Sequence, residues 1–215
     1  MEAIRTVTSL MFLLFSCGVA VRMKKSARVF VMFFASLVML IPLEDVRAAT
    51  ITTGAICTLV DAIKSANTNT AVNGCAAGAA GHDTIVVTWG VVLTAINNGS
   101  GSNANGLPVI TEDLTLRSSA PGIMRSIQRS AAAGTPEFRI MEIGGAAPSV
   151  TLRGLSLRFG KLIGSPPVAG VPVGVAGGCI KMGAGNLMIV DSLIEECNAQ
   201  GADNVTTAGG DASGG

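Results

Sequence analysis

The chain is poor in aromatic and charged residues. Of its 215 residues 4% are aromatic, none is tyrosine, and 13% are charged. Proteins that bind nucleic acid combine a basic surface with aromatic rings on which bases stack. Beyond residue 48, 9 Lys and Arg stand against 11 Asp and Glu, a net charge of −2, and the arginines are dispersed along the sequence. We therefore expect no nucleic-acid partner.

Histidine and closely spaced cysteines are also scarce. His82 is the only histidine, and no two cysteines form a CxxC pair, whereas zinc sites are built from such ligands at such spacings. Asp203 and Asp211 lack the spacing of calcium-binding repeats. The sequence shows no acid and nucleophile that match His82. We expect no metal, no cofactor and no catalytic residue, and we interpret His82 as a turn residue.

Long apolar runs occur only within residues 9–43, as SLMFLLFSCGVAV and VFVMFFASLVMLIPL. The second run follows a basic segment with Lys24, Lys25 and Arg28 and precedes small residues, which is the order of a secretion signal. We predict a signal peptide over residues 23–48, cleaved after Ala48. The alternative is a membrane-spanning helix, although 15 apolar residues fall short of the usual ~20.

The expected product is secreted or held at the cell surface or outer membrane of a bacterium, and it contacts a membrane only through its N-terminal hydrophobic segments. Residues 1–22 are then a mis-called start or an extra hydrophobic segment. Two alternatives are a lipid anchor at Cys17 and a two-helix hairpin whose basic loop stays cytoplasmic.

Four cysteines stand in the exported part: Cys57, Cys75, Cys179 and Cys197. An even number of cysteines in an exported chain predicts two disulfides, for which three pairings exist. The two neighbouring pairs have the same separation, 18 residues.

From Asp83 onward the sequence has the pattern of short strands broken by glycine-rich loops. Two segments, VTLRGLSL and LMIVDSLI, repeat at an offset of 37 residues, and DLTLRS lies 36 residues before the first of them. The matching positions are Val150, Leu152, Gly154 and Leu157 in the first segment and Leu187, Ile189, Asp191 and Ile194 in the second. Such a period, without long helices, predicts an all-β solenoid of stacked coils, a parallel β-helix.

The segment between Cys57 and Cys75 predicts a short helix. Thr58 and Asp61 have the spacing of a capping box, and Leu59, Ile63 and Ala66 make one apolar stripe. A helix of about two turns is unstable alone in water. We hypothesise that a Cys57–Cys75 disulfide pins this helix over the open end of the first coil.

The expected organisation follows from these segments. We predict a cap and first coil over residues 49–106, β-helix coils over 107–200 and a glycine-rich, truncated tail over 201–215.

The stretch CTLVDAIKSANTNTAVNGCAAGAAGHDTIVV resembles the opening of a bacterial family of exported proteins, whose signature reads CSLREAI, then an AN-rich segment, a second cysteine and a GADTI-like strand. The later coils are similar to polymorphic outer-membrane protein repeats, so the resemblance covers residues 54–215. The chain departs at Val60 and Asp61, where the family has Arg and Glu, and at His82, where it has a small residue. The resemblance implies a right-handed parallel β-helix on an exported, often surface-associated protein, and it carries no established catalytic residue.

Enzymes such as pectate lyases resemble this architecture and use clustered carboxylates beside a basic residue. The candidates for such a cluster are Asp191, Glu195, Glu196 and Arg153 or Arg158, with Asp191 and Glu195 on one outer surface near Arg153. We interpret them as a solvated face and a corner turn.

We expect a structural, adhesion or binding role toward a surface ligand such as a polysaccharide or a cell-envelope component. In relatives, a segment like the final AGGDASGG leads into a further coil, so we expect this chain to be a truncated member of the family. The alternative is a carbohydrate-active β-helix enzyme, a polysaccharide lyase or hydrolase without its catalytic coils.

Overall fold

A computed structural model describes residues 48–164, 174–201 and 212–213. The two apolar runs, Cys17, the signal peptide up to residue 47, and most of the tail, including Asp203 and Asp211, lie outside the described residues. Within these ranges, the helical elements are α3 (Leu59–Thr68) and the 3₁₀ turn η1 (Gly101–Asn103). The strands are β1 (Thr50–Thr52), β2 (Asp83–Val87), β3 (Val91–Leu93), β4 (Leu114–Ser118), β5 (Arg125–Arg129), β6 (Met141–Ile143), β7 (Ser149–Arg153), β8 (Leu155–Arg158), β9 (Lys161–Ile163), β10 (Val175–Ala176), β11 (Ile180–Met182), β12 (Asn186–Val190), β13 (Leu193–Glu195), β14 (Asn198–Gln200) and β15 (Ala212–Ser213).

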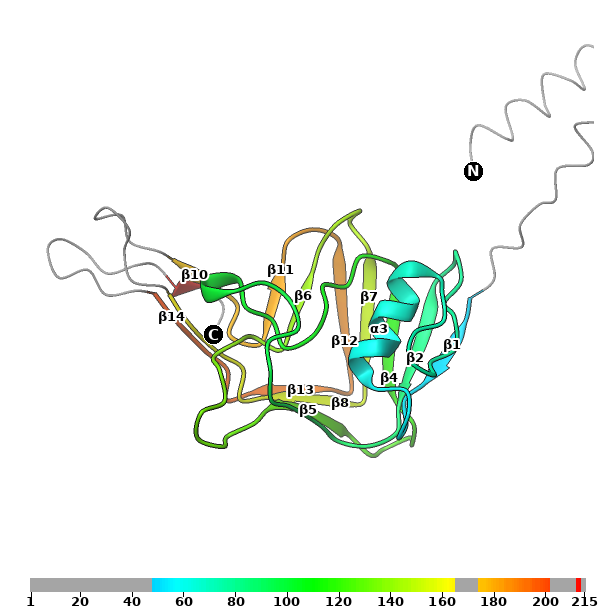
Figure 1. The fold of residues 1–215 in the computed structure, drawn as a ribbon, viewed down its shortest axis with the longest axis horizontal. Helices are drawn as coiled ribbons and strands as arrows, with labels where there is room; N and C mark the ends of the chain where they lie inside the picture. The colour runs from blue at the N-terminus through cyan, green and yellow to red at the C-terminus, as the bar shows by residue number, and fades with distance from the viewer. Residues whose placement is uncertain (1–47, 165–173, 202–211, 214–215) are drawn as a thin grey trace, which may run out of the picture. The chain divides into compact units, whose positions relative to one another are not determined.

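The strands pair in parallel with strands of the coils before and after them. One sheet has the order β1-β2-β4-β7-β12 and a second the order β13-β8-β5-β3, while β6 pairs with β11, β9 with β14 and β10 with β15. All of these pairs are parallel, and Figure 1 shows successive coils side by side. The predicted fold, a solenoid of stacked parallel strands, is confirmed.

The predicted repeat sets the register of the main sheet. Val150 is opposite Leu187 in β12, and Leu114 is opposite Val150, so the offsets of 37 and 36 residues are both confirmed. Because side chains alternate between the two faces of a strand, the residues at these equivalent positions of successive coils all point into the core.

A ladder of aliphatic side chains forms the core of the main sheet. Ile51, Ile85, Leu116, Leu152 and Ile189 are in register on five successive strands. The first four are completely buried, but Ile189 in the last strand is 45% exposed. Each buried side chain of the ladder contributes roughly 1.5–3 kcal/mol to the stability of the fold. The ladder is narrow enough for aliphatic side chains to fill it without aromatic rings.

Helix α3 packs against β1 and β2, the first two strands of the main sheet (Figure 1). The Oγ1 of Thr58 accepts a hydrogen bond from Asp61 N at 3.1 Å, which confirms the predicted N-cap. The predicted stripe is also confirmed, because Leu59, Ile63 and Ala66 are buried in the core. The helix therefore closes the end of the stack at which β1 lies.

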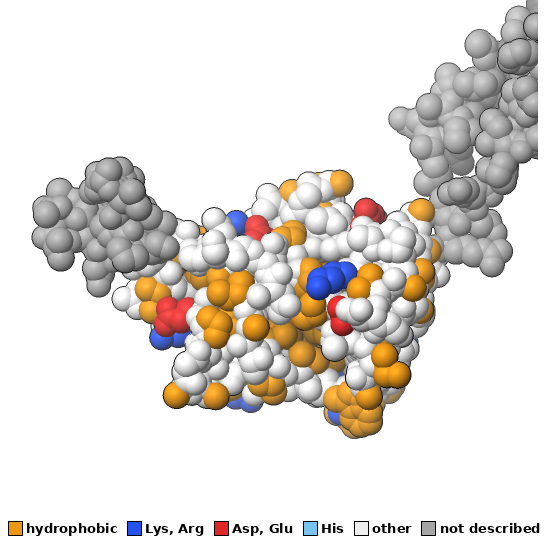
Figure 2. Space-filling view, in the orientation of Figure 1, with side chains coloured by type: hydrophobic (Ala, Val, Ile, Leu, Met, Phe, Trp, Pro, Cys, Tyr) orange, Lys and Arg blue, Asp and Glu red, His pale blue; other side chains and the backbone are white. Residues whose placement is uncertain are grey.

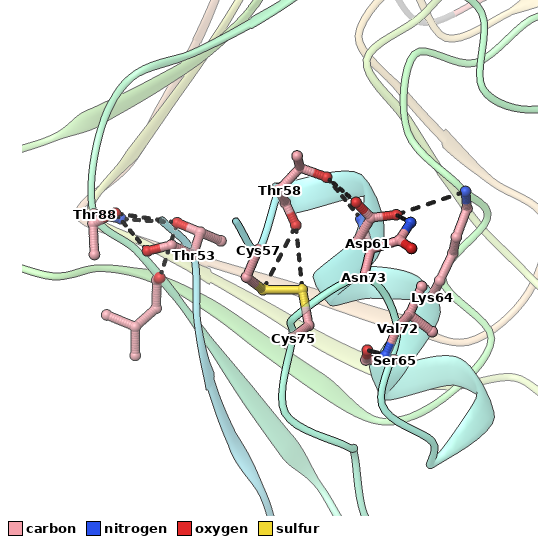
Figure 3. Close-up of a disulfide and its surroundings, with 11 residues drawn as sticks. Thr53, Cys57, Thr58, Asp61, Lys64, Ser65, Val72, Asn73, Cys75 and Thr88 are labelled. Carbon is pink, nitrogen blue, oxygen red and sulfur yellow. Dashed lines mark hydrogen bonds and ion pairs between the residues drawn. A yellow bond between two sulfur atoms is a disulfide. The ribbon is translucent and has the colours of Figure 1, made fainter. Parts of the chain in front are cut away.

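A disulfide joins Cys57 and Cys75, whose Cα atoms are 4.6 Å apart (Figure 3). It ties the start of α3 to the polar turn that follows the helix. Outside this segment, the buried carboxylate of Asp83 accepts hydrogen bonds from Ala49 N, before β1, at 2.8 Å and from Ala79 N, after Cys75, at 3.1 Å. The disulfide and Asp83 together hold the cap on the first coil.

The second disulfide joins Cys179 to Cys197, with Cα atoms 5.3 Å apart, so both neighbouring pairs are bonded. It ties the residue before β11 to the corner between β13 and β14. Only glycine fits beside it at residue 160, since a Cβ there would overlap Gly178 O and approach Cys179 Sγ to 2.9 Å.

Candidate functional site

The corner between β4 and β5 is longer than the equivalent corners of its neighbours. Residues 119–124 join β4 to β5, whereas Gly154 alone joins β7 to β8 and residues 88–90 join β2 to β3. Ser118 fastens the longer corner: its Oγ accepts a hydrogen bond from Ala120 N at 3.2 Å and donates one to Ile123 O at 2.6 Å. Ser118 therefore contacts this corner loop, residues 119–124, near both of its ends.

The corner loop forms one side of a cleft of about 880 Å³. Arg117 in β4, Arg153 in β7 and Asp191 directly after β12 line it, so each of three successive coils contributes one charged side chain. The volume lies in the range of about 300–1,000 Å³ that small-molecule sites occupy.

The two arginines lie directly opposite each other in adjacent strands. Strands of one sheet are about 4.8 Å apart, and like charges in opposite positions destabilise a sheet. Arg117 Nη1 donates to the carbonyl oxygen of Ser118 at 3.3 Å. Among the described residues, neither Arg117 nor Arg153 forms an ion pair. The cleft thus carries concentrated positive charge on two neighbouring coils.

Asp191 is at the corner after β12, one coil beyond Gly154. Both residues have left-handed backbones, with φ of 48° for Asp191 and 64° for Gly154, and a non-glycine residue is uncommon in this conformation. The Asp191 side chain is exposed in the cleft. The expectation that Asp191 and Arg153 share one surface is therefore met.

The other candidate acids lie outside this cleft. Arg158 Nε is 2.7 Å from Glu195 Oε1, and its Nη2 is 3.0 Å from Glu196 Oε2. The guanidinium also lies 4.9 Å from the centre of the Phe159 ring. The candidates expected on one surface are therefore divided: Glu195 and Glu196 pair with Arg158, whereas Asp191 and Arg153 line the cleft. The corner after β12 turns the chain into β13, which places Glu195 on a different sheet from Arg153.

An ionic network surrounds the buried side chain of Arg139 on the side of the solenoid formed by β6 and β11. Arg139 has no exposed surface, and its Nη2 donates to Ser102 O at 2.7 Å. The carboxylate of Glu142 is 3.6 Å from Arg139 Nη1 and 2.9 Å from Lys181 Nζ, and it accepts a hydrogen bond from Asn105 at 2.9 Å. The network holds the loop around η1 against β6 and β11.

Burial sets the charge balance of this network. Burial lowers the pKa of Arg139, although the negative charge of Glu142 acts to raise it. Burial alone would raise the pKa of Glu142, but hydrogen bonds from Lys181 and Asn105 and the charges of Lys181 and Arg139 outweigh it, so the pKa of Glu142 is lowered. Two cations therefore hold Glu142 ionised, and we assign this network to stability.

Sequence reasoning missed both the network and the position of Arg117 in the cleft. The offset of 36 residues that aligns Leu114 with Val150 also aligns Arg117 with Arg153, so the paired arginines had a readable signal. Glu142 faces Lys181 at an offset of 39 residues, which the shorter repeat does not indicate.

His82 lies on the surface before β2, where its Nε2 is 2.8 Å from Thr115 Oγ1. In the described ranges, no three His, Cys, Asp or Glu side chains gather to hold a metal ion. The face in Figure 2 shows only scattered acidic and basic side chains.

The residues that the structure describes include no helix with the length and apolar character needed to cross a membrane. Comparisons of the chain with protein-family models, curated proteins and solved structures returned no match.

Proposed function

We propose that the protein is an exported, surface-associated β-helix with a binding or adhesion role, and that its ligand occupies the cleft beside the corner loop. The observation that carries this proposal is the pair Arg117 and Arg153, aligned on adjacent coils, without ion-pair partners among the described residues and facing a cleft of about 880 Å³. Positive charge that is concentrated in a cleft attracts and orients a ligand of opposite charge.

Export is supported by the chemistry of the cysteines. Disulfides persist in oxidising compartments and are rare in the cytosol, and both neighbouring cysteine pairs of the described chain are bonded. The bonded helix followed by parallel coils is also the arrangement implied by the resemblance to exported proteins with a CSLREAI signature. We extend the proposal to membership of that family.

Binding fits the cleft better than catalysis does. Glycoside hydrolases use a pair of carboxylates that flank the scissile bond, whereas Asp191 is the one carboxylate among the residues lining this cleft. The acids Glu195 and Glu196 are engaged by Arg158. A role in holding a surface polysaccharide or another cell-envelope component needs only the fixed charges and the shape of the cleft.

The test uses the full chain expressed in a bacterium. Surface proteolysis and cell fractionation locate the product, and N-terminal sequencing identifies its mature start. The exported product is then passed over immobilised surface polysaccharides, and released sugar ends are measured in parallel. The proposal expects an oxidised, exported protein that is retained without releasing sugars. A reduced cytoplasmic product, or retention on none of the polysaccharides, contradicts it; release of sugar ends supports the alternative of a polysaccharide lyase or hydrolase.

A further inference from the structure

The two arginines of the cleft can share one counter-charge. Arg117 and Arg153 extend from adjacent strands in the same register, so one oxyanion between them can accept hydrogen bonds from both guanidinium groups. Planar guanidinium groups bind carboxylate and sulfate through paired hydrogen bonds. The position before Arg117 in this ladder is Val86 and the position after Arg153 is Val190, which restricts the positive charge to two coils.

The corner loop gives the cleft an apolar part of its lining, and no aromatic ring lines the cleft. Ile123 is 53% exposed and Met124 is 52% exposed, and both line the cleft on the corner loop. Such side chains pack against the C–H surface of a ring, whereas recognition of nucleic-acid bases relies on aromatic stacking. A saccharide matches this side of the cleft better than a nucleotide does.

Asp191 adds an acceptor at the far end. It lines the cleft one coil beyond Arg153, where a second anionic group would be repelled. A carboxylate accepts hydrogen bonds from hydroxyl groups. The cleft therefore offers two donors for an acid group, an apolar wall and an acceptor for a hydroxyl group.

We infer that the cleft binds an acidic saccharide, whose carboxylate or sulfate group lies between Arg117 and Arg153 and whose hydroxyl group donates to Asp191. This inference rests on the proposed binding role of the same cleft and specifies its ligand class.

Titration calorimetry on the exported, disulfide-bonded product tests the inference with four polymers. Polygalacturonate carries carboxylates and dextran sulfate carries sulfates; fully methyl-esterified polygalacturonate and dextran are their uncharged counterparts. We expect binding to at least one of the charged polymers, no binding to its uncharged counterpart, and weakening as salt rises, because salt screens exposed charges.

Variants separate a specific contact from general attraction. Arg117→Gln and Arg153→Gln should each weaken binding about tenfold, the size of one lost charge-assisted hydrogen bond. Lys64→Gln removes the same charge from the exposed face of α3, away from the cleft residues, and should leave the affinity within about twofold, as a distant surface charge should. Asp191→Asn should weaken binding to the saccharide, whereas attraction by net charge alone would make this variant bind more tightly.

The outcomes distinguish the inference from the function on which it rests. Equal binding of charged and uncharged polymers, unaffected by the arginine variants, keeps a binding role but overturns the acidic ligand. Tighter binding by Asp191→Asn overturns the hydroxyl contact. If the protein binds none of the polysaccharides, the proposed binding function is wrong as well. Circular dichroism of each variant verifies the fold. Arg153→Lys keeps the charge but loses the planar fork, so it should bind with intermediate affinity; affinity equal to that of the unmodified protein would contradict paired hydrogen bonds from Arg153.

Discussion

Removing the Cys57–Cys75 disulfide should uncap the solenoid. In the double variant Cys57→Ser, Cys75→Ser, helix α3 is held only by its packing and hydrogen bonds. The bond closes a segment with a sequence separation of 18 residues, for which the chain-entropy estimate gives about 3 kcal/mol of stabilisation. That is a large fraction of the ~5–15 kcal/mol that keeps a typical domain folded.

The packing of the helix sets what is exposed when the cap opens. Leu59 is 2% exposed and Ile63 is fully buried, and releasing both forfeits roughly 3–6 kcal/mol at 1.5–3 kcal/mol for each side chain. A helix of 10 residues does not persist alone in water. Opening of α3 would therefore also uncover Ile51, the first rung of the aliphatic ladder.

Native-state hydrogen exchange and urea unfolding measure the two consequences. A loss of about 3 kcal/mol raises the population of the open cap about 100-fold, since ~1.4 kcal/mol is a factor of ten. The faster exchange should be concentrated in α3 and β1. Limited proteolysis should cut between residues 57 and 75 in the variant before it cuts the coils.

The second disulfide is a matched control. Cys179 and Cys197 have the same separation of 18 residues, so their replacement by serine should cost a similar free energy of unfolding. The faster exchange should then appear around β11 and β14 and leave α3 protected. A variant without the Cys57–Cys75 bond whose α3 amides stay protected, and which remains monomeric and protease-resistant, would refute the role of the cap.

Three other predictions concern parts of the fold, and four substitutions test them. Asp83→Ala leaves buried backbone amides without an acceptor and should lower the free energy of urea unfolding by about 2–3 kcal/mol; unchanged stability would show that these hydrogen bonds contribute nothing. Gly160→Ala forces a Cβ into neighbouring backbone and should cost about 1–3 kcal/mol, whereas Gly54→Ala, with open space around it, should stay within about 0.5 kcal/mol; equal costs would contradict the close approach at residue 160. Because the folded pKa of Glu142 is lowered, its contribution to stability is complete above the unfolded pKa of about 4.3 and is lost as pH falls through the folded pKa. In the Glu142→Gln variant, the free energy of unfolding should therefore change less with pH in this acid range. The same pH dependence in the variant and in the unmodified protein would disprove the assignment.

Much of the fold was predictable because it depends on local spacing. The offsets that align Leu114, Val150 and Leu187 appear directly in the sequence, and a parallel stack repeats the same register from coil to coil. The N-cap formed by Thr58 and Asp61 is likewise a short-range arrangement.

The candidate site was predictable only in part. Arg153 and Asp191 were identified from the repeat, and both line the cleft. Their separation from Glu195 was not foreseen, because it depends on the direction that the chain takes after the corner at Asp191. The cleft itself depends on the corner loop, whose length changes the offset from 36 residues between β4 and β7 to 30 residues between β5 and β8.

The sequence by itself determined the period, the capping helix and the inward-facing aliphatic positions, because each follows from residues that are close in the chain or repeat at one offset. Only the tertiary structure decided which charges meet. Arg158 pairs with acids about one coil away, the buried Arg139 and the partly exposed Lys181 both contact Glu142, and Arg117 and Arg153 share a cleft. The physical reason is that corners of unequal length shift each side of the solenoid by a different number of residues, so contacts between side chains depend on the folded path of the backbone.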